Sequence, residues 1–328
     1  MAVQATAVRV RCVFRKGPAP ETLGLPPSEI SRWRAVSRVL RSPLDALSCT
    51  ILPADCSLCG SPLPRLSSAP ICAACWSEVP VQSGPTCARC GDSLDRPVPV
   101  GNLDPVLCRT CRLAPPPFVK AVAYGRYEGR MRELIHAFKY HGLRPAARQL
   151  GLLLARSIAS LAQEAPGGLL VVPVPLHRAK HAERGFNQAR LLAVEAIAAL
   201  RKQHPEWHLT LAPTSLMRLR PTESQAGLTP RQRRLNLRGA FGVSDPSVVM
   251  QQRVLVVDDI FTTGATARSA SRALLEAGAE SVWVATLARA HRIDRGGFDR
   301  SLVASPDALA MPVPLQNATM NAQHQPSF

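Results

Sequence analysis

Aromatic side chains are scarce in this chain of 328 residues, where Phe, Trp and Tyr together make up 5% of the sequence. So few rings leave few surfaces on which the bases of a single-stranded nucleic acid could stack. No apolar run approaches the roughly 18–20 residues that cross a bilayer. The first fifteen residues also lack the apolar stretch of a secretory signal. We therefore expect a cytoplasmic protein without membrane insertion.

Acidic residues are also in short supply. Asp and Glu number 23 against 40 Lys and Arg, which gives a formal net charge of +17. An excess of this size favours an anionic partner, such as a nucleotide, a phosphate or a nucleic acid. A basic protein from an arginine-rich proteome would show the same excess, and composition alone does not separate the two interpretations.

Cysteine is concentrated in one segment, in four CxxC pairs, and disulfides are rare in a reducing cytosol. The pairs are Cys56/Cys59, Cys72/Cys75, Cys87/Cys90 and Cys108/Cys111. Glycine follows the first and third pairs, so the pattern repeats and indicates two consecutive four-cysteine ribbons. Four thiolates around Zn²⁺ leave no open position for substrate, so we expect about two structural zinc ions per chain. Interleaved pairing of the first with the third pair stays open, as does an iron–sulfur cluster.

Composition divides the chain into four parts. Residues 1–48 are rich in Arg, Pro and Ser and are expected to form a basic flexible leader. Residues 49–117 hold the double zinc ribbon and end in three prolines. Residues 118–290 form a second domain. Residues 291–328 show little pattern and are predicted to be mostly disordered.

The second domain alternates apolar strands with amphipathic helices. The predicted strands cover 119–127, 169–176, 253–257 and 281–288. The predicted helices cover 129–140, 145–161, 186–201 and 266–277. This alternation predicts an α/β fold, with a mostly parallel sheet flanked by helices on both faces.

A candidate anion site follows the strand at 253–257. Asp258 and Asp259 come at its carboxyl end, where open α/β sheets bind ligands, and paired carboxylates suit ribose hydroxyls or metal-bound water. The chain then turns into a helix whose amides and dipole favour an anion. This loop has no lysine, which excludes a Walker A motif, and it lacks the GxGxxG spacing of a dinucleotide fold. An Asp-Asp turn with a threonine cap is the purely structural alternative.

The thirteen residues at 254–266 resemble the phosphoribosyl pyrophosphate signature of type I phosphoribosyltransferases. The resemblance implies that Asp258 and Asp259 contact the ribose hydroxyls, and we assign them as the candidate catalytic pair. It also implies a loop that holds the 5-phosphate. The residues of that loop are Thr262, Thr263, Gly264, Ala265 and Thr266.

Further segments match one narrower family. They are 134–139 with Gly142, 172–177, Arg178, Lys180, His181, 184–188, and a basic stretch with Arg218, Arg220, Gln225, Arg231, Arg233, Arg234, Asn236 and Phe241. Together with the cysteine ribbons, their order resembles the competence protein F (ComF) family, which includes the GntX-type proteins. The resemblance covers about residues 50–290.

This resemblance implies a loop near 174–185 that contacts pyrophosphate and a hood near 215–238. The candidate cations are Arg178, Lys180, Arg184 and Arg218. It further implies Mg²⁺ and phosphoribosyl pyrophosphate or ribose 5-phosphate as ligands, with transfer to an unknown nitrogen acceptor. The alternatives are a sensor of the sugar phosphate and a non-catalytic DNA-uptake factor that binds single-stranded DNA and a competence helicase. Lys139 is interpreted only as a charge at a helix C-terminus.

Overall fold

The computed structural model describes residues 55–64, 69–94, 105–165, 167–220, 232, 237 and 239–291. Apart from residues 62–64, all of these belong to one compact unit. The predicted leader, nearly all of the predicted tail and most of the basic stretch between 221 and 238 lie outside the described residues. Within the described ranges, no helix has the length and apolar character needed to span a membrane.

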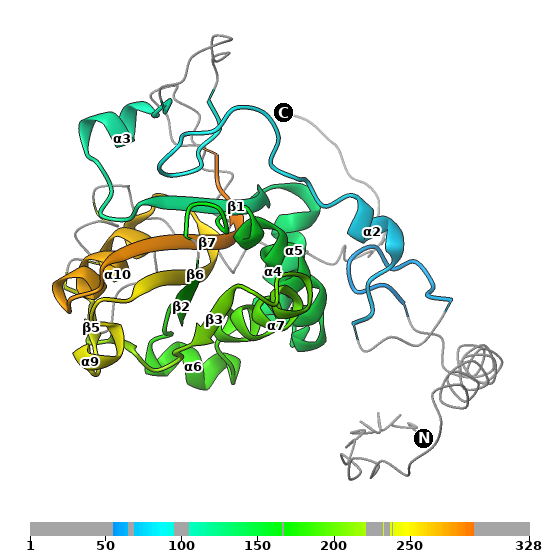
Figure 1. Cartoon of the computed structure of the whole chain (residues 1–328). Coiled ribbons are helices and arrows are strands. Elements are labelled where there is room, and N and C mark those ends of the chain that lie inside the picture. The colour runs from blue at the N-terminus through cyan, green and yellow to red at the C-terminus, as the bar shows by residue number, and fades with distance from the viewer. Residues whose placement is uncertain are drawn as a thin grey trace, which may run out of the picture. The chain divides into compact units, whose positions relative to one another are not determined.

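A five-stranded parallel sheet forms the centre of the second domain, in the order β1-β7-β6-β2-β3 (Figure 1). Its strands are β1 Lys120–Arg126, β2 Gly168–Pro173, β3 His208–Leu211, β6 Arg253–Phe261 and β7 Ser281–Arg289. Every neighbouring pair in this sheet is parallel. The predicted fold class is therefore confirmed, and β3 is a strand that the sequence pattern did not reveal.

Helices cover both faces of this sheet. They are α4 Gly129–Tyr140, α5 Ala147–Ala159, α6 Arg178–Arg184, α7 Gln188–Gln203, α9 Pro246–Val249 and α10 Ala265–Glu276, with a 3-10 turn at Arg144–Ala146. Val254 and Val256 pack in one core cluster with Leu274 of α10. Leu255 and Val257 are buried as fully as Val254 and Val256. Because side chains alternate along a strand, Leu255 and Val257 lie on the opposite face of the sheet. There α7 contacts β6, while α5 contacts α7, β1 and β7.

The central strand β6 is longer than the sequence predicted. It continues to pair with β7 beyond Val257, with Asp258 opposite Thr286 and Phe261 opposite Arg289. The two acids therefore lie inside the strand rather than after it. Apolar residues on β7 continue to Ala288, so the neighbouring strand extends the ladder where the local pattern of β6 had already become polar.

Two further elements flank the carboxyl edge of the sheet. Strands β4 Leu216–Arg218 and β5 Phe241–Val243 form an antiparallel pair. The segment after β2, expected to be a loop near 174–185, contains the short helix α6. The ring Nδ1 of His177 caps this helix by accepting the N–H of Ala179 at 3.3 Å. Gly185 ends it with a left-handed backbone at φ 71°.

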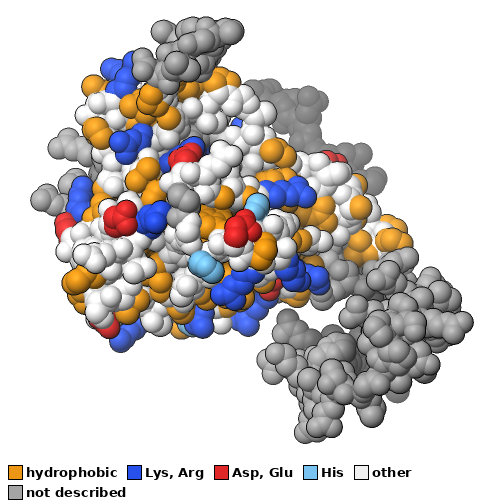
Figure 2. Space-filling view, in the orientation of Figure 1, with side chains coloured by type: hydrophobic (Ala, Val, Ile, Leu, Met, Phe, Trp, Pro, Cys, Tyr) orange, Lys and Arg blue, Asp and Glu red, His pale blue; other side chains and the backbone are white. Residues whose placement is uncertain are grey.

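Charge on the displayed face of the molecule is mainly positive. Lys and Arg side chains are more widespread than Asp and Glu side chains on this face, and apolar side chains lie between them (Figure 2). The view agrees with the composition of the whole chain, which carries 40 basic and 23 acidic residues.

Candidate functional site

The cysteine segment forms two separate thiol clusters. Within each cluster the sulfur atoms lie within 4.8 Å of one another. The clusters are Cys56, Cys59, Cys72 and Cys75, and Cys87, Cys90, Cys108 and Cys111. Consecutive pairs therefore come together, and the interleaved pairing that the sequence left open does not occur.

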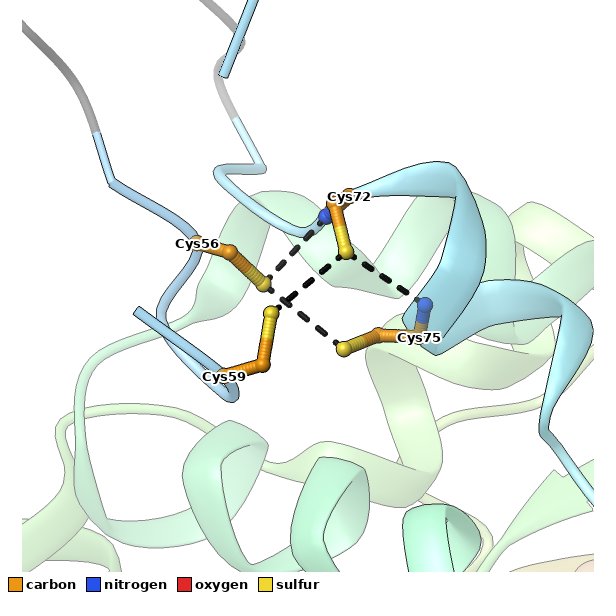
Figure 3. Close-up of side chains that lie close together, drawn as sticks. All are labelled: Cys56, Cys59, Cys72 and Cys75. Atoms are coloured by element: carbon orange, nitrogen blue, oxygen red, sulfur yellow. Dashed lines mark hydrogen bonds between the residues drawn. The ribbon is translucent and has the colours of Figure 1, made fainter. Parts of the chain in front are cut away.

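In the first cluster, four side chains from two segments of the chain point toward one centre (Figure 3). The Cys56 and Cys75 sulfurs are 3.8 Å apart, and those of Cys59 and Cys72 are 3.6 Å apart. Four thiolates at about 2.3 Å from a tetrahedral zinc ion have sulfurs about 3.8 Å apart. The Cys72 amide also donates to the Cys56 sulfur at 3.3 Å. The spacing and donor set fit a zinc ion, which would cross-link the two segments.

The second cluster repeats this geometry and is joined to the core of the sheet. The Cys90 and Cys108 sulfurs are 3.7 Å apart, and the Cys108 amide donates to the Cys87 sulfur at 3.3 Å. Cys87, Cys90 and Cys111 are buried in the same core cluster as Phe118 and two valines of β6, Val254 and Val256. This ribbon therefore shares its core with the second domain, and its closed four-sulfur set offers structural support rather than a reaction centre.

The predicted phosphate loop forms the N-terminal end of α10. Gly264 is the N-cap with a left-handed backbone at φ 73°. A Cβ at Gly264 would lie 2.6 Å from the ring of Phe261, so only glycine fits between the loop and that ring. The first amides of α10 have no carbonyl partner within the helix and favour an anion.

One pocket collects five of the seven residues that the sequence predicted for the acidic pair and the phosphate loop. It is lined by Asp258, Thr262, Gly264, Ala265 and Thr266, together with Val174 beyond the end of β2. Thr263 is placed differently: it is buried, its hydroxyl accepts the Ala265 N–H at 3.3 Å, and it lines a second pocket beside Arg268 and Arg289. The structure therefore groups four of the five predicted loop residues around one space and turns the fifth inward.

The two acids have different partners. Asp259 Oδ2 lies 2.8 Å from the Lys139 ammonium, whereas Asp258 Oδ1 accepts the backbone N–H of Asp259 at 2.9 Å. Burial, and then the neighbouring Asp259 charge, raise the pKa of Asp258 to about 7, against the opposing influence of Lys139 and Arg218. The pair is therefore asymmetric before any ligand arrives.

Lys139 is the main residue of this site that sequence reasoning missed. It was interpreted as a charge at the end of its helix, but its side chain is only 16% exposed. The signal was available in the sequence, because Lys139 follows Ile135 by one turn and so lies on the buried face of α4. Ile135 has no exposed surface.

The four predicted cations fall into two groups. Burial lowers the pKa of Lys180, and the nearby charges of Arg184, Arg218 and Lys139 act in the same direction. Burial also lowers the pKa of Arg218, while Asp258 opposes the shift. Arg218 therefore acts directly on Asp258, and Lys180 lies near Arg218 and Lys139. Arg178, by contrast, is exposed at the start of α6.

Arg184 contacts the protein itself. Its guanidinium stacks over the Tyr140 ring at 4.8 Å from the centroid and donates to the Tyr140 hydroxyl at 2.9 Å. It also donates to Gln188 at 3.3 Å. These contacts join α6 to α4 and α7, so Arg184 holds the helix that carries Lys180.

Comparison with known proteins agrees with both parts of this architecture. Residues 47–112 match the family described as a double zinc ribbon domain, and residues 202–301 match the phosphoribosyl transferase domain. The DNA utilization protein YhgH of Salmonella typhi is 33% identical over 242 residues, which cover 73% of this chain and 98% of that protein.

Two similar proteins carry competence names. Competence protein F of Haemophilus influenzae is 30% identical over 224 residues, covering 67% of this chain and 90% of that protein. Competence protein ComFC of Bacillus subtilis is 29% identical over 227 residues, covering 67% of this chain and 84% of that protein. With its double zinc ribbon, its phosphoribosyltransferase-type sheet and these relatives, the chain belongs to the competence protein F (ComF) family.

Proposed function

We propose that the pocket at the carboxyl end of β6 binds the ribose 5-phosphate part of phosphoribosyl pyrophosphate, with Mg²⁺. The observation that carries the proposal is a single space lined by the Asp258 carboxylate, the Thr262 and Thr266 residues and the first turn of α10. A carboxylate suits sugar hydroxyls, and a helix N-terminus suits a phosphate. One pocket thus offers both halves of a phosphorylated ribose a complementary partner.

The surrounding cations suit the leaving group. Lys180 and Arg218 act electrostatically on each other, and Arg218 acts on Asp258. Pyrophosphate carries several negative charges, which such cations would offset. When bound, Mg²⁺ would add further positive charge near the pyrophosphate and the ribose hydroxyls.

We infer a phosphoribosyl transfer as the reaction that this arrangement would support. The bond from C1 to pyrophosphate breaks with its electron pair leaving on the pyrophosphate oxygen. The lone pair of a nitrogen nucleophile then forms the new C1–N bond on the opposite face, and that nitrogen loses a proton. The protein contributes position, charge neutralisation and exclusion of water, without a covalent intermediate.

A binding and turnover measurement tests this proposal. Calorimetry should detect the binding of phosphoribosyl pyrophosphate and of ribose 5-phosphate. Thr266→Val should weaken the binding of both ligands. Thr210→Val, on the exposed side of β3, is the matched control and should bind normally. Pyrophosphate release is then followed with a panel of nitrogenous bases. Binding together with pyrophosphate release supports transfer. Binding without pyrophosphate release in the presence of any base excludes transfer and leaves a sensor of the sugar phosphate. Absence of binding rejects the proposal.

A second candidate function is DNA uptake without catalysis, through single-stranded DNA and a helicase partner. Two observations favour it: the competence names of two relatives and the net charge of +17. The low aromatic content weighs against it, because stacking surfaces are few. Affinity for a single-stranded oligonucleotide should fall steeply with added salt as counterion release becomes less favourable. A protein that does not bind the oligonucleotide at low salt would rule this candidate out.

A further inference from the structure

A lysine enters the acidic pair from a neighbouring helix. Lys139 lies in the last turn of α4, and its ammonium is 2.8 Å from Asp259 Oδ2. The side chains of Lys139 and Asp259 are 16% and 12% exposed. By contrast, the ion pair of Lys120 and Glu164 is 31% and 40% exposed. The Lys139 pair is the more deeply buried of the two and is not an ordinary surface ion pair.

Burial makes this pair costly to separate. An ammonium withdrawn from water needs a close opposite charge, and removing either partner leaves the other uncompensated. Burial alone would lower the pKa of Lys139, but the Asp259 carboxylate outweighs it and raises that pKa overall. Lys139 and Asp259 are therefore held together as an ammonium and a carboxylate.

The side chains of the two neighbouring acids consequently lie on opposite faces of the sheet. Successive side chains of a strand leave opposite faces of the sheet. Among the described residues, Asp258 lines the ligand pocket together with Thr262 and Thr266, whereas Asp259 is not part of that lining. The partner of Asp259 is Lys139, and the Asp259 backbone N–H holds Asp258 Oδ1.

We propose that Lys139 is a positioning residue that holds Asp259 toward α4, so that Asp258 is the carboxylate presented to the ribose hydroxyls. This inference rests on the proposed function and divides the roles of two acids that the sequence motif treats alike. Lys139 acts through its ion pair with Asp259 and through its charge on Asp258, and among the described residues it is not part of the pocket lining.

Several charged and titratable groups surround the pair and set its response to pH. Those that interact with Lys139 or Asp259 are Asp258 on β6, Tyr127 after β1, His136 on α4 and Lys180 on α6. Arg218 on β4 acts on Asp258, and Arg132 and Tyr140 on α4 act on Tyr127. Lys139 and Arg218 oppose the upward shift in the pKa of Asp258. Loss of the Lys139 charge would therefore raise the pKa of Asp258 further, because two adjacent carboxylates cannot both ionise easily.

The test compares the pH dependence of ribose 5-phosphate binding, between pH 6 and 9 at fixed Mg²⁺, in the full-length protein and three variants. Lys139→Met should weaken binding at pH 7 about ten-fold and move the midpoint of the profile upward by about one pH unit. Lys139→Arg should restore the wild-type midpoint. The matched control, Lys120→Met, removes an exposed ion pair and should leave the profile unchanged. The phosphate of the ligand titrates equally in all four proteins, so differences report on the protein.

A wild-type midpoint in a folded Lys139→Met protein would overturn the inference while leaving the proposed function intact. If the methionine variant does not fold, carbonyl ¹³C NMR of the wild-type protein decides the matter. Ribose 5-phosphate should shift the Asp258 carboxyl signal more than the Asp259 carboxyl signal. Equal ligand shifts at the two acids, or a larger shift at Asp259, would reject the division of roles. Wild-type protein that binds no sugar phosphate would reject the proposed function and the inference that rests on it, whereas an unchanged midpoint in Lys139→Met rejects the inference alone.

Discussion

The guanidinium of Arg289 lies 4.2 Å from the centroid of the Phe261 ring. The same side chain contacts the second cysteine ribbon, with Nη2 at 3.2 Å from Asp92 Oδ2 and 3.5 Å from the Cys90 sulfur. The edge of the Phe261 ring lies where a side chain on Gly264 would be. Arg289, at the end of β7, and Phe261 together therefore connect the ribbon to the phosphate loop.

Replacing Arg289 tests this contact. Arg289 and Asp92 have side chains only 3% and 9% exposed, so Arg289→Leu should leave a buried carboxylate whose remaining ion-pair partner is His291, with Nδ1 at 4.0 Å. We expect the free energy of unfolding to fall by about 3–5 kcal/mol, together with loss of sugar phosphate affinity, measured by denaturant titration and calorimetry.

The matched control is Arg126→Leu, because Arg126 and Glu128 form a pair that is 50% and 48% exposed. A solvent-exposed pair contributes about 0–1 kcal/mol. Equal, small losses in the two variants would show that Arg289 does not support the domain.

The two ribbons should differ in what their metal supports. Wild-type protein is expected to carry about two zinc ions per chain, and Cys75→Ser or Cys111→Ser should each remove one. Among the described residues, the core cluster of the sheet includes three cysteines of the second ribbon and none of the first, so Cys111→Ser should lower the melting temperature of the phosphoribosyltransferase domain more. Elemental analysis and calorimetry measure the two effects. Equal melting temperatures for the variants, or iron in place of zinc, would contradict this expectation.

Gly264→Ala should remove ligand binding. The new Cβ would lie 2.6 Å from the Phe261 ring, on a backbone at φ 73°, and the left-handed strain alone costs about 1–3 kcal/mol. Gly278→Ala is the control, because its φ is 95° but its new Cβ would be 3.6 Å from the nearest atom, in Met250. Both variants should be destabilised, and only Gly264→Ala should lose ribose 5-phosphate affinity. Normal affinity in Gly264→Ala would mean that the loop does not hold the phosphate.

Asp258 should make the protein less stable as pH rises. Its pKa increases from an ordinary value near 3.8 to about 7 on folding, chiefly through burial. Between these two values the folded state binds more protons than the unfolded state, so stability falls as pH rises through that window and the full cost remains above it. Asp258→Asn should therefore stabilise the protein at pH 8, by on the order of 2–4 kcal/mol, and change little near pH 4. Denaturant titrations at the two pH values measure this difference.

The control for that prediction is Asp245, whose pKa shifts in the opposite direction from that of Asp258. Two hydrogen bonds from Ser247 lower the pKa of Asp245. The Asp245 carboxylate therefore stabilises the folded protein above its ordinary pKa, and this stabilisation is lost as pH falls. Asp245→Asn should not stabilise the protein at pH 8. If Asp258→Asn also failed to do so, the carboxylate at 258 would not be destabilising in the folded state.

Much of the architecture was predictable because it depends on short-range patterns. The CxxC spacing predicted the metal-type clusters, and apolar periodicity located α4 at Gly129–Tyr140 with both of its ends. The phosphate loop was also visible, since its residues are contiguous and a turn into a helix N-terminus is a local structure. Residues near in sequence meet whatever the rest of the chain does, so their arrangement can be read directly.

Tertiary structure decided which distant residues meet at that loop. Lys139 and Asp259 come from different elements, and so do Arg289 and Asp92. Pairing with β7 extended β6 beyond its apolar stretch and placed the two acids inside the strand. Such contacts depend on strand order and helix packing, which no local pattern encodes. The sequence by itself determined that a phosphate-type loop follows a buried strand. Only the packing of α4 beside that strand determined that the two acids have different surroundings.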